Sequence, residues 1–109
     1  MKRDTVYLNH ILDSIKKIEE YTKIGKKFFF SEIHWQDATI RQLEIIGEAT
    51  KRISNETRQS YPEVPWRRMA GLRDILIHEY SGINIKIIWD VITNKIPSLK
   101  DTINEIIKN

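Results

Sequence analysis

The sequence predicts an all-α fold, an up-and-down bundle of four main helices followed by a short C-terminal helix. Apolar residues recur at the three- and four-residue spacing of amphipathic helices, and no stretch of useful length alternates apolar and polar residues as a strand does. Isoleucine is common and by itself favours strands, because β-branched residues suit sheets. The helical spacing outweighs that preference.

The first helix is predicted to begin near Asp4 or Thr5, either of which can cap it, and to end in a left-handed turn at Gly25. Its apolar stripe has helical spacing: Leu8, Ile11, Leu12, Ile15 and Ile18. The segment "KIGKKFFF", residues 23 to 30, follows. Its cations and aromatic rings suit either a platform on which single-stranded nucleic acid stacks or an apolar plug at the end of the bundle.

The second helix is predicted from about Ser31 to Asn55. One broad face of it is apolar: Trp35, Ala38, Ile45, Ile46, Ala49 and Ile53, widened by Leu43. "SNETRQSYPEVP", residues 54 to 65, is then predicted to be a polar connection. Pro65 suits the first turn of a third helix, "PWRRMAGLRDILIHEY".

Gly82 and Asn84 separate the third helix from the fourth, which Asn84 can cap. The fourth helix repeats the apolar spacing at Ile85, Ile88, Trp89 and Ile92. Pro97 and Ser98 mark the start of the C-terminal helix, with its stripe at Leu99, Ile103, Ile106 and Ile107. Because helices joined by short links pack antiparallel, these elements are expected to form a bundle.

Composition limits the class of protein. The length of residues 1–109 suits one domain. Cysteine is absent, which excludes disulfides and thiolate metal sites, and His10 and His34 lack ligand-like spacing, so we expect neither a metal nor a cofactor. No apolar run reaches the length of a membrane span or a signal peptide, which predicts a cytoplasmic protein. The net charge of +3 favours a polyanionic partner without requiring one.

Two helices carry more apolar residues than one buried face needs. Ile87 and Val91 lie off the stripe of the fourth helix, and Ile40 and Leu43 widen that of the second. Helices that are apolar around much of their circumference usually bury a second face. A homodimer is the simplest way to cover it.

The segment "GLRDILIHEYSG", residues 71 to 82, gathers ionisable groups at the end of a core helix. Asp74 and His78 are four apart and share a helix face, whereas Arg73 and His78 lie about 140° apart around the helix. Arg73 and His78 converge only if the helix ends near His78, if the Arg73 side chain wraps round, or if two copies meet. The alternative is a solvated face on which His78 complements the helix dipole.

The order of motifs resembles the HepT-like branch of the HEPN superfamily. "RDILIHEY" reads Arg-x-x-x-x-His-x-Tyr, and it lies within "YPEVPWRRMAGLRDILIHEYSGINIKIIWDVI", residues 61 to 92. The upstream segment "DATIRQLEIIGEATKRIS", residues 37 to 54, and the tail "IPSLKDTINEII" resemble the same branch. The resemblance covers most of the chain, and together with "IIGEA", "PW" and "GLRD" in order it is specific.

The resemblance implies a HEPN-like helical bundle that dimerises and places two Arg-x-x-x-x-His motifs at a shared cleft. Many such proteins are metal-independent ribonucleases that act as toxins beside a MntA-type nucleotidyltransferase antitoxin. Arg73 and His78 match the catalytic positions of that motif. Tyr80 matches the position to which antitoxins of this family attach AMP, which would block the cleft.

Three features leave alternatives open. Asp74 stands where relatives often carry asparagine, so it either supports catalysis by tuning His78 or weakens the nuclease. Arg67 and Arg68 either extend a positive field that binds RNA or are simply solvated. The whole chain is either the RNA-cleaving toxin or a non-catalytic helical adaptor that binds a nucleotidyltransferase or a nucleotide.

Overall fold

The computed structural model describes the backbone of residues 2–78 and 84–109 and the side chains of residues 3–72 and 84–109. This part of the chain is helical, as predicted, and contains no strand. Its helices are α1 (Lys2–Thr22), α2 (Lys26–Ser31), α3 (Ile33–Lys51), α4 (Asn55–Ser60), α5 (Trp66–His78), α6 (Ile85–Asn94) and α7 (Ile96–Lys108). The molecule measures 41 × 27 × 20 Å.

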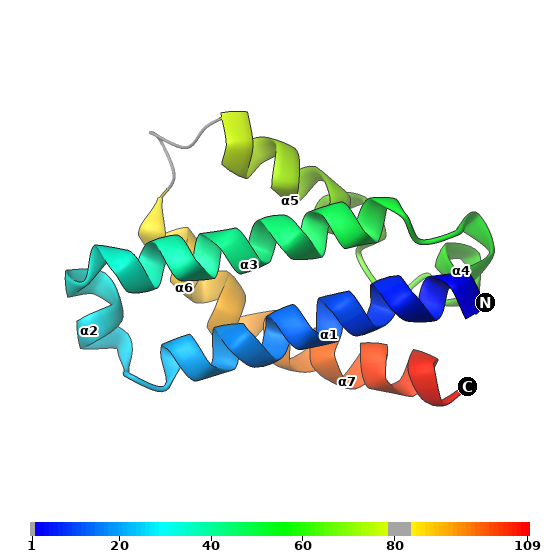
Figure 1. Cartoon of the computed structure of the whole chain (residues 1–109), viewed down its shortest axis with the longest axis horizontal. Helices are drawn as coiled ribbons and strands as arrows, with labels where there is room; N and C mark the ends of the chain where they lie inside the picture. Colours follow the sequence, from blue (N-terminus) through cyan, green and yellow to red (C-terminus); the bar gives the residue numbers. More distant parts are fainter. Residues whose placement is uncertain (1, 79–83) are drawn as a thin grey trace.

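The bundle is built around the antiparallel pair α1 and α3 (Figure 1). Helix α5 packs on α3, α7 packs on α1, and α6 packs on α7. The start of α1 and the end of α7 lie at the same end of the molecule, whereas α2 lies at the other (Figure 1). The core between these helices consists mainly of isoleucine and leucine side chains, among them Leu8, Ile11, Ile15, Ile18, Leu43, Ile46 and Ile103.

Helix α1 buries the predicted stripe in full, because Leu8, Ile11, Leu12, Ile15 and Ile18 are all buried. Its predicted cap is wrong. The helix begins at Lys2, so Asp4 lies within the first turn, where it bonds to another helix. Gly25 has the positive φ that was predicted, 97°, but its ψ of 160° is not that of a left-handed helical turn; α1 ends at Thr22, and Gly25 is the N-cap of α2. That conformation favours glycine, since a Cβ would be strained there.

The predicted second helix is divided in two. Glu32 is extended, with φ −114° and ψ 102°, and separates α2 from α3. Gln36 stabilises this break, because its Nε2 donates to the carbonyls of Phe29 and Phe30 at 3.0 and 3.1 Å. Helix α3 ends at Lys51 rather than at Asn55.

The buried face of α3 also differs from the prediction. Ile40 and Leu43 are only 5% and 1% exposed, whereas Ile45 is half-buried. The reason is that α3 lies between α1 and α5 and is covered from both sides. These two residues therefore give no support for a second subunit, whereas Ile87 is 60% exposed.

The segment predicted as a polar connection contains the short helix α4. Ser54 is its N-cap, and its Oγ accepts a hydrogen bond from the Thr57 amide at 3.2 Å. Buried Asp4 accepts from the Ser54 amide at 3.0 Å, the Ser54 hydroxyl at 2.6 Å and the Thr57 hydroxyl at 2.5 Å. These bonds fasten the first turn of α1 to α4.

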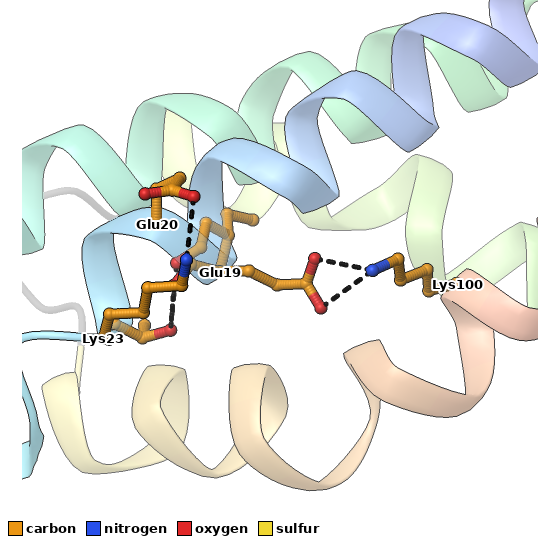
Figure 2. A network of polar contacts seen from close by, with 6 residues as sticks. Glu19, Glu20, Lys23 and Lys100 are labelled. Carbon is orange, nitrogen blue, oxygen red and sulfur yellow. Dashed lines mark hydrogen bonds and ion pairs between the residues drawn. The ribbon is translucent and has the colours of Figure 1, made fainter.

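The remaining helices follow the prediction closely. Helix α5 starts at Trp66, one residue after Pro65, and α6 is capped by Asn84, whose Oδ1 accepts from the Lys86 amide at 2.9 Å. Helix α7 is longer than expected, with 13 residues against 10 in α6. It is tied to α1 because Lys100 Nζ lies 2.9 and 3.2 Å from the two carboxylate oxygens of Glu19 (Figure 2).

Within the described residues, no helix is both long and apolar enough to cross a membrane.

Candidate functional site

Helix α5 is the scaffold of the predicted site, and its first turns are fixed by packing. Trp66 is 5% exposed and its Nε1 donates to the Tyr61 carbonyl at 2.9 Å. Met69 is buried one turn later, and Leu72 packs against the same core. This apolar side holds α5 against α3, so the direction of the helix axis is set before the motif begins.

The backbone of Arg73, Asp74 and His78 belongs to α5, and His78 is its last residue. Asp74 and His78 are one turn apart on the same side of the helix backbone, whereas Arg73 and His78 are separated by about 140°. The side chains of residues 73 to 78 are outside the described part of the structure. Tyr80 lies wholly outside the described residues.

Arg67 and Arg68 are exposed in the first turn of α5 and line a shallow, open hollow of about 470 Å³. Its described lining contains a third arginine and no carboxylate: Arg58, Pro62, Val64, Pro65, Trp66, Arg67 and Arg68. The rise along a helix places Arg68 about 15 Å from His78. The structure therefore places three arginines around one hollow, and this hollow lies at the start of the helix that carries the motif.

Sequence reasoning missed Arg58, which is distant along the chain from the motif. Its Nη2 donates to the Thr50 carbonyl at 2.7 Å and its Nε to the Ile53 carbonyl at 3.2 Å. These bonds satisfy carbonyl groups at the end of α3 and fix the guanidinium beside the start of α5. The two prolines in "YPEVP" were the available signal, because they predict the turn that reverses the chain between Arg58 and Arg67.

A second hollow beside α5 is mostly apolar and has a volume of about 450 Å³. Side chains of α3, α5, α6 and α7 line it, and its charged lining residues are Glu63, Arg68 and Lys95. Among the described residues, no three metal-ligating side chains come together. The expected independence from metals stays a prediction.

Comparison with known proteins gives a consistent result. Residues 11–106 match the model of a family described as "Ribonuclease HepT-like". A Thermococcus cleftensis protein named "Probable ribonuclease HepT" is 46% identical over 86% of this chain and 86% of its own length. A Methanocaldococcus jannaschii protein named "Putative RNase MJ0127" is 44% identical over 99% of this chain and 91% of its own length.

A third relative is a two-part protein. "Gamma-glutamylcyclotransferase and putative RNase MJ0434" of Methanocaldococcus jannaschii is 46% identical over 99% of this chain, which spans 50% of that protein. No solved structure matches this chain.

Proposed function

This chain belongs to the HepT-like ribonuclease family, and on that basis we propose that it is a metal-independent endoribonuclease, the toxin of a cytoplasmic toxin–antitoxin pair. The observation that carries the proposal is the position of the Arg-x-x-x-x-His motif on α5. The motif ends a helix that is packed firmly at its start and begins beside an arginine-lined hollow.

The reaction we propose needs only groups of the protein and the RNA. His78 removes the proton from a ribose 2′-hydroxyl, and the 2′-oxygen attacks the adjacent phosphorus. The bond to the 5′-oxygen breaks and that oxygen gains a proton, which leaves a 2′,3′-cyclic phosphate and a free 5′-hydroxyl. Arg73 donates hydrogen bonds to the phosphate oxygens, on which negative charge builds up in the transition state.

We propose a homodimer because Arg73 and His78 are widely separated around a single helix. The backbone positions of Arg73 and His78 are about 140° apart around one helix, so one small phosphate is reached more easily by motifs from two copies of the chain. Exposed Ile87, near the start of α6, is an apolar residue that such a contact can bury. The proposed cleft therefore has two-fold symmetry, with a motif on each side.

The placement of Arg67 and Arg68 supports a role in RNA binding, because two cations at the start of a helix lower its stability and so serve another purpose. Cations in the first turn of a helix oppose its dipole and cost a few tenths of a kcal/mol each. No acidic residue occupies the first turn of α5 to offset them. We propose that the two arginines, with Arg58, bind phosphates of the RNA segment that leads to the motif.

Tyr80 and Asp74 also have proposed roles, the first in inhibition by the antitoxin and the second in orienting His78. A nucleotidyltransferase antitoxin would attach AMP to Tyr80, and the added phosphate would compete with RNA for the positive field of Arg73. Asp74, one turn from His78 along the α5 backbone, would orient the imidazole and favour its charged form.

The alternative function is a non-catalytic adaptor that binds the nucleotidyltransferase or a nucleotide. The observation that favours it is the largely apolar hollow between α5 and the α6–α7 pair. Such a hollow can receive an apolar side chain of a partner protein without any chemistry.

Cleavage of RNA in the presence of EDTA tests the two functions. We expect the wild-type protein to cut single-stranded RNA and leave a cyclic phosphate end, and His78→Ala to lose this activity. His10→Ala is the matched control, because His10 is an exposed histidine on α1. Cleavage that survives His78→Ala would refute the catalytic assignment. A wild-type protein that cuts no RNA but binds the nucleotidyltransferase tightly would establish the adaptor.

A further inference from the structure

Helices α2 and α6 meet through an aromatic cluster that the proposed reaction does not use. Phe29 is fully buried, and its ring centroid lies 4.9 Å from that of Trp89. The rings of Phe30 and Trp89 are 6.0 Å apart, and both side chains stay half-buried. Phe29 is therefore the plug at this end of the bundle, and it supports two further rings that solvent reaches.

These two rings are held in place. Gln36 bonds to the carbonyls of both Phe29 and Phe30, which fixes the last turn of α2 against α3. Trp89 lies one residue after buried Ile88 in the middle of α6. An aromatic surface that is fixed in advance loses little conformational freedom when a flat ligand stacks on it.

A hollow of about 550 Å³ opens over these rings between α2 and α6. Two lysines belong to its lining, and Lys26 Nζ lies 6.0 Å from the centre of the Phe30 ring. Lys86 lies in the first turn of α6 and is exposed. Asp90 is the carboxylate in the lining, and it accepts a hydrogen bond from Asn94 at 2.5 Å. With two lysines and one carboxylate, the described lining has a net charge of +1.

We propose that this hollow is a stacking site for one base of single-stranded RNA, with the flanking phosphates at Lys26 and Lys86. The inference rests on the proposed ribonuclease function and adds a subsite to it. Aromatic rings beside cations are the combination that binds unpaired nucleotides, because every base offers a flat face and every nucleotide a phosphate. A base inside a duplex has no free face, so the site favours unpaired RNA.

The hollow lies within reach of the motif. His78 and Asn84 are six positions apart in the chain, and an extended chain of six residue steps spans at most about 21 Å. Asn84 directly precedes the first turn of α6, which carries Lys86. An RNA segment of a few nucleotides can therefore extend from His78 to the base at Trp89.

Binding is measured on protein that carries His78→Ala, so that the RNA stays intact, by fluorescence anisotropy of a labelled single-stranded RNA. We expect Lys26→Ala with Lys86→Ala to weaken binding about ten-fold. The slope of log K against log salt should fall by about 1.4, since each lost phosphate contact contributes roughly 0.7. Lys16→Ala with Lys17→Ala is the control, because it removes two exposed lysines from α1.

Stacking is tested separately from charge. Trp89→Leu should weaken binding about ten-fold, whereas Trp89→Phe should keep most of it, because phenylalanine still offers a ring. RNA that carries 4-thiouridine should crosslink under light to peptides that contain Phe30 or Trp89. The crosslink is read in the protein without the tryptophan substitutions, so it does not depend on the folding of those variants.

The outcomes separate this inference from the proposed function. If the wild type cleaves RNA but the lysine pair variant binds like its control and no crosslink reaches α2 or α6, the stacking site is refuted and the nuclease stands. If both lysines and the crosslink behave as expected but no cleavage occurs, the stacking site stands and the catalytic proposal fails. If the protein binds no RNA, both fail.

Discussion

Replacing Asp4 by asparagine should destabilise the protein and change how its stability depends on pH. Asp4 is 2% exposed and accepts three hydrogen bonds, two from Ser54 and one from Thr57. Burial alone would raise the pKa of this carboxyl group, but the hydrogen bonds from Ser54 and Thr57 outweigh burial and hold its pKa below the ordinary value of 3.8. The charged form is therefore the one that the fold stabilises.

The expected cost of Asp4→Asn follows from these three bonds. Hydrogen bonds to a charged group contribute about 1 kcal/mol more than neutral ones, and part of this gain is offset because asparagine is easier to bury. We expect a loss of about 2 kcal/mol in the free energy of unfolding at pH 7. For a chain of this length, that corresponds to a melting temperature lower by roughly 9 °C.

The pH dependence gives the sharper test. Because the folded pKa of Asp4 is lower than the unfolded one, its contribution is complete above about pH 4 and is lost as the pH falls through the folded pKa. The difference between wild type and Asp4→Asn in urea unfolding should therefore shrink between pH 7 and pH 3. Asp13→Asn, at an exposed position of the same helix, should change stability by less than about 0.5 kcal/mol. Equal stability of wild type and Asp4→Asn at pH 7, or a difference that grows in acid, would refute the reasoning.

Two pairs of substitutions test the packing and the turn, both by urea unfolding. Phe29→Ala should cost about 3–5 kcal/mol because the ring is fully buried, whereas Phe28→Ala, at 49% exposure, should cost less than about 1 kcal/mol. Gly25→Ala should cost about 1 kcal/mol because its φ is 97°, although a Cβ there meets nothing within 4 Å. Gly71→Ala, in a helix with equally open space, should instead stabilise by about 0.5–1 kcal/mol. Equal effects within either pair would contradict the assignment.

The apolar pattern was enough to predict the main helices, because burial of a stripe is a property of the local sequence. The five stripe residues of α1 and the Asn84 cap of α6 are where the pattern placed them. The break at Glu32 was not predictable in this way. It depends on Gln36, which reaches back to the carbonyls of α2 once the chain has folded.

Helix α4 was missed for a related reason. It is short and polar, so it has no apolar periodicity, and it is stabilised by the Ser54 cap and by Asp4 in the first turn of α1, which is distant along the chain. Arg67 and Arg68 are exposed, as both of their predicted roles require, so the choice between RNA binding and simple solvation stays open; the hollow that they line was not predicted. That hollow needs Arg58, which arrives only through the turn before Trp66.

The contact between α1 and α7 has a consequence for synthesis on the ribosome. Glu19 and Lys100, which join these helices, are 81 positions apart in the chain. At about 5–20 residues per second, α1 leaves the ribosome roughly 4–16 s before the helix that covers it. During that interval the apolar side of α1 lacks its α7 partner, and apolar surface exposed in this way favours aggregation.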